Sequence, residues 1–252
     1  MILLSSWLWL LLMLGPLLFL ERWIHRHLQG LFLLLTRHSD LALVFYKALF
    51  LPGTIVHEGS HWLVATLLLV HAPKMSIWPE KQADGTLQFG FVETEKVDFV
   101  RESLIGAAPL IAGCAVILLI GYGRLTVGPL AEAVSAGDLG GALAALGAMF
   151  AASDFLIWLY LIFTISNAMM PSSSDRRAWP ALLLVLGALG FVLYQAGLWP
   201  FFANNLAGPV TAGVRTIASA FTLTVFIDLI AVGLVWAVEE GLSRMTGLKV
   251  EY

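Results

Sequence analysis

The chain has 252 residues, of which 59% are hydrophobic and only 12% are charged. A soluble domain has about 25% charged residues, so the composition excludes an ordinary soluble fold and indicates a protein that lies largely within a membrane. The net charge of −3 at pH 7 is too small to indicate a nucleic-acid partner, and the single cysteine, Cys114, excludes a disulfide framework and a cysteine-based metal cluster.

Apolar segments long enough to cross about 30 Å of hydrocarbon, which takes about 20 residues each, recur along the chain. Six segments qualify: 2–20, 50–71, 103–123, 148–170, 178–199 and 214–238. The first lacks a basic leader, so we predict a retained helix rather than a signal peptide. The stretch 31–49 has a polar middle and is either an interfacial helix or a helix leading into 50–71 across a kink at Pro52-Gly53. About six spans are therefore expected, with one more or fewer.

The longest polar region, 72–102, separates the second and third of these spans. Its "KMSIW" and "TLQFGFV" stretches resemble strands, and Asp84-Gly85 between them is a turn signal. We predict a β-hairpin here, and in the Gly/Ala-rich region 124–147 a loop with a short helix. The expected fold is an all-α polytopic membrane protein, a single membrane domain over 1–252, with one small hairpin.

Lys and Arg residues indicate the orientation of the chain. They occur in 72–102, in the connection 171–178 and in the C-terminal tail, whereas the loop expected at 199–213 has none. The positive-inside rule places the first three on the cytoplasmic side. The arginines within 22–37 do not fit a simple count of spans, so the topology of the N-terminal part stays open.

The segment 51–70, "LPGTIVHEGSHWLVATLLLV", carries two imidazoles and a carboxylate in an otherwise apolar run. His57, Glu58 and His61 form an H-E-x-x-H motif. On a helix the two histidines share a face and can reach one ion, while Glu58 lies beside that ion as a general base. Zinc suits this donor set, and bound Zn²⁺ lowers the pKa of water to about 7. The alternative is that both histidines are structural. This alternative is less favoured, because ionisable residues inside a membrane span are costly and usually mark function.

A catalytic zinc takes three protein ligands, so a third ligand has to come from elsewhere in the chain. His71 lies ten residues beyond His61, about 15 Å along a helix, which is too far. Three acids near or within apolar runs are candidates: Asp154, Asp175 and Asp228. Two late acids, Glu239 and Glu240, would suit a different class of membrane metallopeptidase but have no accompanying motif.

In these motifs the chain resembles the site-2 protease family of intramembrane metalloproteases. Members carry H-E-x-x-H on one transmembrane helix, and a second helix ends in an Asn-x-x-Pro…Asp-Gly motif whose Asp is the third zinc ligand. Here Asn167, Pro171 and Asp175 match that pattern, with the proline one place late and Arg176 where the family has Gly. The resemblance implies that Asp175 is the third ligand. The alternative is that Asp175, with the serines before it, caps the next helix.

The resemblance covers roughly residues 50–178, which would form the metalloprotease core, followed by a C-terminal helix pair and tail over 178–252. A hairpin or re-entrant sheet follows the motif helix in the family, as 74–92 does here. Next comes a helix with a small-residue patch, matched by Gly106-Ala107-Ala108-Pro109. No PDZ or CBS module is recognisable, which implies a near-minimal catalytic core.

The function implied is zinc-dependent cleavage of a peptide bond in or near a membrane segment of a membrane-anchored protein or remnant signal peptide. Glu58 would be the general base, and Asn167 would donate to the oxyanion or hold the substrate strand. The strand 86–92, with Gln88, Phe89 and Gly90, would pair with an extended substrate. The structural alternatives are that Asn167 only forms a hydrogen bond near a helix end and that the hairpin only covers the mouth of the active site.

Localisation and rival functions complete the expectations. The resemblance and the charge pattern imply a multi-pass protein of a prokaryotic cell membrane with its active site open to the cytoplasm. The rivals are a catalytically silent scaffold on the protease fold, against which Glu58 argues, and a six-span transporter, for which we find no internal repeat. Asp154 and Asp228 are expected to face the interior of the bundle or a partner. The oligomeric state is open.

Overall fold

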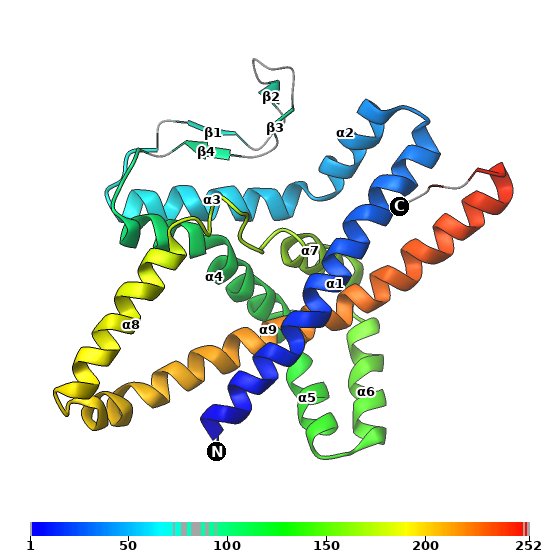
Figure 1. Cartoon of the computed structure of the whole chain (residues 1–252). Coiled ribbons are helices and arrows are strands. Elements are labelled where there is room, and N and C mark those ends of the chain that lie inside the picture. The colour runs from blue at the N-terminus through cyan, green and yellow to red at the C-terminus, as the bar shows by residue number, and fades with distance from the viewer. Residues whose placement is uncertain are drawn as a thin grey trace.

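The computed structural model describes residues 2–72, 74–76, 80–81, 87–88, 91–93, 95–248 and 250. The helices in these ranges are α1 (Ile2–Thr36), α2 (Ser39–Leu49), α3 (Leu51–Leu67), α4 (Phe99–Gly123), α5 (Val127–Ser135), α6 (Leu139–Phe150), α7 (Phe155–Ser166), α8 (Trp179–Gln195) and α9 (Trp199–Thr246). The short strands are β1 (Lys74–Ser76), β2 (Glu80–Lys81), β3 (Leu87–Gln88) and β4 (Phe91–Glu93). Figure 1 shows their arrangement.

Three helices, α1, α4 and α9, contain stretches long and apolar enough to cross a membrane. The bent pairs α2–α3 (67°) and α6–α7 (97°) raise the number of candidate spans to five if each pair is one span. At 17 residues, α8 is apolar but falls short of that length. The all-α membrane class is thus supported. The predicted count of about six spans, one more or fewer, agrees with these candidates only if each bent pair is one span, and it stays a prediction.

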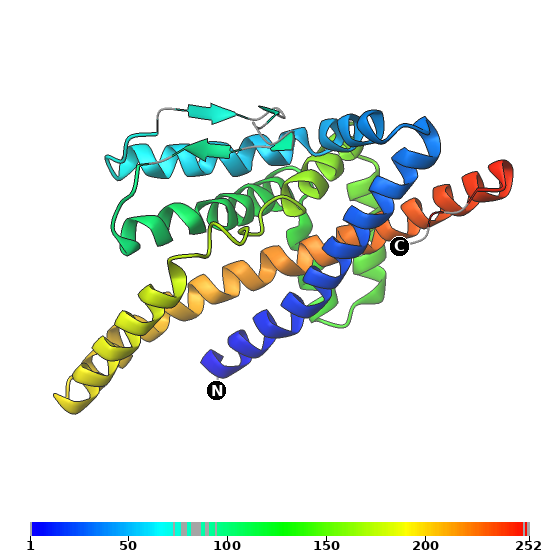
Figure 2. The ribbon, with the colours of Figure 1, turned by 45° about the horizontal axis from the view of Figure 1, so that its top comes forward.

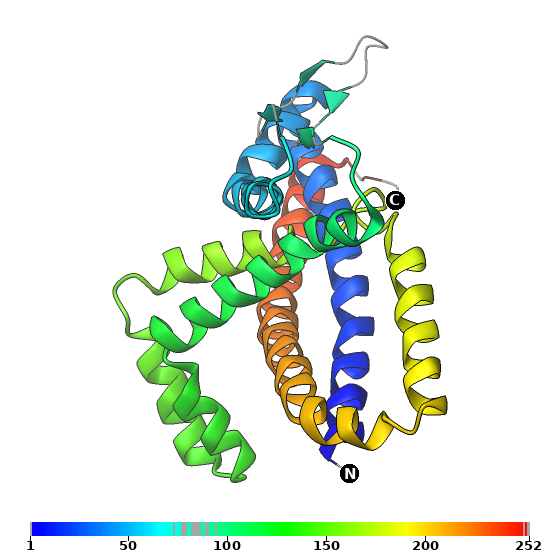
Figure 3. The ribbon, with the colours of Figure 1, turned by 90° about the vertical axis from the view of Figure 1, so that its left-hand side faces the viewer.

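One region predicted as a loop, 199–213, is helical, and another predicted as a loop with a short helix, 124–147, contains more helix than expected. The residues 199–213 continue into α9, whose 48 residues extend for about 72 Å. Pro200 lies in the first turn of α9, where the absent N–H has no helical partner to lose, so it starts the helix rather than breaking it. The Gly/Ala-rich region 124–147 holds α5 and most of α6. In Figure 3 these two helices form a pair to one side of α1 and α9.

The stretch 31–49 is divided between two helices, because residues 31–36 end α1 and α2 begins at Ser39 and leads into the motif helix. The break expected at Pro52-Gly53 lies at Phe50 instead, and the interfacial alternative for this stretch stays a prediction. The left-handed φ of 56° at Arg37 follows the end of α1, and α2 then runs toward α3 with a bend at Phe50. Pro52 lies in the first turn of α3, where proline is well tolerated. Leu51–Leu67, which carries the motif, is therefore a separate straight segment.

The core forms where α4 and α7 meet α1 and α9. Ile117 and Ile162 are completely buried there, and Phe221 of α9 packs in the same cluster. The helix α3 packs on α4 and α7, and α1 packs along α9 (Figures 1 and 2). The metal-binding motif therefore lies on a helix that is supported from one side by the core.

The strands lie beside α3, on the side away from α9 (Figure 1). β1 pairs with β4 in antiparallel register, with Lys74 opposite Glu93, and β2 pairs with β3, with Glu80 opposite Gln88. The predicted turn at Asp84-Gly85 lies outside the described residues, so a single continuous hairpin stays a prediction.

Candidate metal centre

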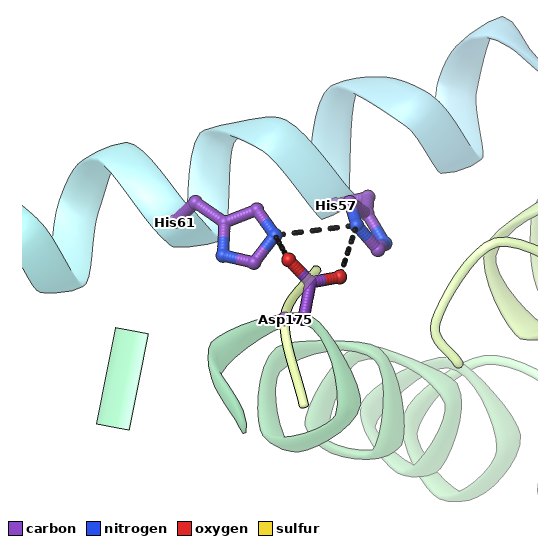
Figure 4. A group of neighbouring side chains, drawn as sticks. All are labelled: His57, His61 and Asp175. Carbon is purple, nitrogen blue, oxygen red and sulfur yellow. Dashed lines mark hydrogen bonds and ion pairs between the residues drawn. The ribbon is translucent and has the colours of Figure 1, made fainter. Parts of the chain in front are cut away.

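The two histidines of the motif meet on one face of α3. His57 and His61 are one helical turn apart, and their Nε2 atoms lie 3.3 Å from each other (Figure 4). His61 is buried, and the side chain of His57 is 15% exposed. The sequence prediction that both rings reach the same point is borne out by this geometry.

Backbone carbonyls fix the protonation of both rings. The Nδ1 atom of His57 lies 2.5 Å from the carbonyl oxygen of Ala168, and Nδ1 of His61 lies 2.8 Å from that of Ile105. A carbonyl oxygen only accepts, so each Nδ1 donates and each neutral ring keeps a lone pair on Nε2. Two such lone pairs 3.3 Å apart repel each other unless a cation lies between them. The hydrogen bonds thus prepare both rings as metal ligands.

Asp175 completes the group from a distant part of the chain. Its Oδ1 lies 3.3 Å from Nε2 of His61, and its Oδ2 lies 3.7 Å from Nε2 of His57. Tetrahedral zinc with bonds of 2.0–2.1 Å has ligand atoms about 3.3–3.4 Å apart. The distances from His61 to His57 and to Asp175 match this value, and the distance from His57 to the other oxygen of Asp175 is slightly longer. Among the described residues, His57, His61 and Asp175 are the group of three with ligand atoms close enough to hold a metal ion.

The loop between α7 and α8 holds Asp175 in place. The backbone N–H of Ser172 donates to Oδ2 of Asp175 (2.7 Å), and the Ser172 hydroxyl accepts from the backbone N–H of Asp175 (3.3 Å). Burial acts to raise the pKa of the Asp175 carboxyl, but interactions with His57 and Ser172 outweigh it and hold that pKa well below its usual range. The carboxylate is therefore ionised, as a metal ligand requires.

The alternative role of Asp175 as a helix cap is wrong. The residue that precedes α8 is Ala178, and no side chain caps that helix end. Asp175 lies three residues before that position, between α3 and α4 (Figure 4). The serines of 172–174 serve the loop itself, since the Ser172 and Ser174 hydroxyls bond each other at 2.7 Å.

Three glycines let neighbouring segments of the site approach closely. A Cβ added at Gly106 of α4 would lie 2.0 Å from the carbonyl oxygen of Asp175. A Cβ at Gly53 of α3 would lie 2.0 Å from the carbonyl oxygen of Thr164, and one at Gly113 would lie 2.4 Å from Cβ of Met169. The predicted patch 106–109 contained the first of these, and helical spacing from it points to Gly113.

Glu58, the predicted general base, is buried beside the ligand group. It follows His57 directly on α3, is 8% exposed, and interacts electrostatically with His57 and Asp175. The 100° turn per helical residue places it next to the ligands rather than among them. Its predicted role as a base stays a prediction that this position favours.

Asn167 and Asp228 lie together in the interior, apart from the ligand group. The amide of Asn167 donates to Oδ1 of Asp228 (2.8 Å) and to the carbonyl oxygen of Phe163 (3.0 Å). Asp228 is fully buried, as expected for an acid within an apolar run. The amide of Asn167 is thus engaged near the end of α7, and its predicted role in holding substrate stays a prediction.

The other acids considered as possible zinc ligands lie away from the metal centre. Asp154 lies exposed at the bend between α6 and α7, where it accepts a hydrogen bond from the indole of Trp158 (2.5 Å). It therefore does not face the interior of the bundle, and the alternative that it faces a partner stays a prediction. That bend brings it out of the apolar run in which the sequence placed it. Glu239 binds His27 (2.6 Å) and Glu240 binds Arg244 (2.8 Å), so neither approaches the motif.

The predicted substrate strand is described only in part. Gln88 belongs to β3, whereas Phe89 and Gly90 lie outside the described residues. The strands β1 and β4 contact α3, which carries the motif. Pairing of a substrate with this region stays a prediction.

Comparisons with known proteins add no evidence on what this site does. No family model, curated protein or solved structure matches this chain. The long apolar helices indicate a membrane protein, and two histidines and one aspartate form a group that can hold a metal ion.

Proposed function

We propose that the protein is an intramembrane zinc metalloprotease. The observation that supports this most is the convergence of two unprotonated Nε2 atoms from one helix and one carboxylate from a distant loop, 3.3–3.7 Å apart, with an acid beside the first histidine. Three protein ligands with a fourth position left for water are typical of catalytic rather than structural zinc sites. The H-E-x-x-H motif adds the base that hydrolysis needs.

Each residue has a separate task in this proposal. His57, His61 and Asp175 hold the ion, which when bound supplies Lewis acidity and an activated water. Glu58 accepts the proton from the attacking water and delivers it to the departing amine nitrogen. Burial of Glu58, which is 8% exposed, limits the competition of bulk water for that proton.

The substrate we propose is a membrane-anchored protein or a remnant signal peptide, cut in or near its membrane segment. A peptide bond within a helix has its amide and carbonyl groups already bonded, so the substrate must be extended before it can be attacked. Strand addition near β3 and β4 would replace the lost hydrogen bonds. We further propose that the site opens to the cytoplasm of a prokaryotic cell, following the Lys and Arg pattern.

The first test is zinc content. The full chain, purified in detergent, is expected to retain one zinc per molecule by elemental analysis, and Asp175→Ala is expected to lose it. Asp154→Ala is the matched control, since that acid is exposed at a distant bend. Retention of zinc by Asp175→Ala would contradict the ligand assignment.

The second test is proteolysis. Membranes from cells expressing the wild type or Glu58→Gln are compared by labelling newly formed protein N-termini. Glu58→Gln should keep the zinc and lose the cleavages. Identical profiles for the two forms would instead support a catalytically silent scaffold.

A further inference from the structure

A second cluster of polar side chains meets at Asn167, the residue next to Ala168, whose carbonyl oxygen accepts from His57. Its members are His25 of α1, Tyr46 of α2, Asn167 at the end of α7 and Asp228 of α9. Tyr46, Asn167 and Asp228 are each less than a tenth exposed. Buried polar groups in a membrane protein are costly and mark function, and the proposed reaction gives no role to His25, Tyr46 or Asp228.

The cluster holds Asn167 at two separate points. His25 Nε2 lies 3.1 Å from the main-chain carbonyl oxygen of Asn167, and this oxygen only accepts, so Nε2 carries the proton. The Tyr46 hydroxyl lies 2.6 Å from His25 Nδ1 and donates to it, which fixes that tautomer. From the other side, Asp228 accepts from the Asn167 side-chain amide at 2.8 Å.

The next residue after Asn167 is the one that orients a metal ligand. The carbonyl oxygen of Ala168 accepts the hydrogen bond from His57 Nδ1. His25 fixes the plane of the 167–168 peptide, so the Ala168 carbonyl that follows can point in few directions. Close packing of Gly53 against Thr164 and Ala168 adds to this constraint.

We propose that His25 and Asp228 are positioning residues for the metal ligand His57, acting through Asn167 and the Ala168 carbonyl. They hold the end of α7 so that the Ala168 carbonyl keeps the His57 ring in the tautomer and orientation in which Nε2 faces the ion. The expected effect on metal binding rests on the proposed function. The orientation of the His57 ring does not, because it is a property of the chain itself. Partners of this kind typically change metal affinity 10–100-fold.

The test uses matched pairs of variants in the full chain. Asp228→Leu removes the acceptor for Asn167, whereas Asp228→Asn keeps an acceptor oxygen of the same shape. His25→Phe removes the donor to the Asn167 carbonyl, whereas His25→Gln keeps an amide donor. Thr224→Val is the control, because Thr224 is fully buried one turn away on α9 and has no hydrogen-bond partner for its hydroxyl among the described residues.

Two readouts are measured on each variant. The first is Co²⁺ affinity, by competition with a chelator, together with the visible absorption bands of the bound ion. We expect about tenfold weaker binding and altered bands for Asp228→Leu and His25→Phe, and values near wild type for Asp228→Asn, His25→Gln and the control. The second is the tautomer of the His57 ring, from NMR of ¹⁵N-labelled histidine in metal-free protein. Wild type should carry the proton on Nδ1, and the two disruptive variants should populate both tautomers.

These readouts separate this inference from the proposed function. Wild-type affinity and unchanged tautomer in both Asp228→Leu and His25→Phe would overturn the positioning role while leaving the zinc site intact. Absence of metal from the wild type with a changed tautomer in the variants would overturn the function and keep the positioning role. If Asp228→Leu does not fold, His25→Phe against His25→Gln decides the question alone.

Discussion

Two clusters that contain histidines, one with His57 and His61 and one with His25, bond to adjacent residues at the end of α7, and they differ in how their ring nitrogens are used. In His25 both ring nitrogens have protein partners, the hydroxyl of Tyr46 and the carbonyl of Asn167. In His57 and His61 only Nδ1 has a carbonyl partner, and the two Nε2 atoms face each other and Asp175. The comparison teaches that a histidine able to bind a metal ion is recognised by a ring nitrogen whose lone pair faces no hydrogen-bond donor.

The two clusters also differ in which parts of the chain they join. The metal cluster joins α3 to the loop before α8, and α4 contributes the Ile105 carbonyl. The other cluster joins α1, α2 and α9 to the end of α7. Their common element is the pair Asn167-Ala168, so the N-terminal and C-terminal helices support a site to which they contribute no proposed ligand.

The largest effect is expected when the comparison is tested by removing one histidine from each cluster. His61→Ala removes a ligand and should abolish zinc retention, because two ligands hold zinc far more weakly than three. His25→Gln, which keeps a donor to Asn167, should retain one zinc per molecule. Elemental analysis of both purified variants makes the measurement. Zinc loss from His25→Gln with retention in His61→Ala would reverse the assignment of the two clusters.

The next effect concerns stability on metal removal. A ligand that binds only the folded state stabilises it by about 4 kcal/mol at a concentration of 1,000 Kd. Chelation should therefore lower the thermal unfolding midpoint of the wild type clearly, and that of Asp175→Ala hardly at all. Differential scanning calorimetry in detergent tests this. An equal decrease in both proteins would mean that the chelator acts elsewhere.

A smaller effect is expected at the close contact beneath Asp175. Gly106→Ala would place a Cβ 2.0 Å from the Asp175 carbonyl oxygen, so the loop must move. Overpacking of this kind costs about 1–3 kcal/mol of stability, and here it also displaces the third ligand. Gly123→Ala on the same helix is the control, because its Cβ would meet nothing within 4 Å. Chelator competition and thermal unfolding of the pair measure both consequences; equal zinc affinity in the two variants would count against this account.

The sequence was sufficient for the parts of the site that depend on local spacing. H-E-x-x-H on a helix fixes the relation of His57 and His61 because 3.6 residues make one turn. The choice of Asp175 over Asp154 and Asp228 required a family resemblance, since no local rule states which loop returns to α3. The carbonyls of Ala168 and Ile105 left no signal at all, because any residue supplies a carbonyl. They became visible only when three distant segments were placed together.

The fold was predictable in class but less so in its boundaries. Apolar content and the shortage of charges were sufficient to predict helices in a membrane. Hydropathy could not separate the sharp bend at 151–154 from a continuous span, because residues on both sides of it are equally apolar. It also could not show that 199–213 is helical, since Asn204, Gly208 and Pro209 resemble loop residues while Pro200 in the first turn permits a helix.

The smallest effect is expected at the exposed start of α4, which tests whether the metal cluster depends on every element that contacts it. Asp98 caps this helix, accepting from the backbone N–H groups of Val100 and Arg101, each at 3.1 Å. The Arg101 N–H is the main cause of the lowered pKa of Asp98. A lowered pKa means that the cap stabilises the folded state above the pKa of the unfolded chain and that this contribution is lost as the pH falls through the folded value.

Asp98→Ala should therefore lower stability slightly at neutral pH and remove part of the acid sensitivity of the wild type. Asp98→Asn should keep the stability, because Asn caps as well as Asp, and also remove that pH dependence. Zinc affinity should be unchanged in both, since Ile105 and Gly106 lie two helical turns further along, within the packed part of α4. Unfolding midpoints at several pH values, with chelator competition, provide the measurement. A parallel loss of zinc affinity in Asp98→Ala would show that the Ile105 carbonyl is held by the whole helix, and that the metal cluster, like the His25 cluster, draws its order from beyond its immediate neighbours.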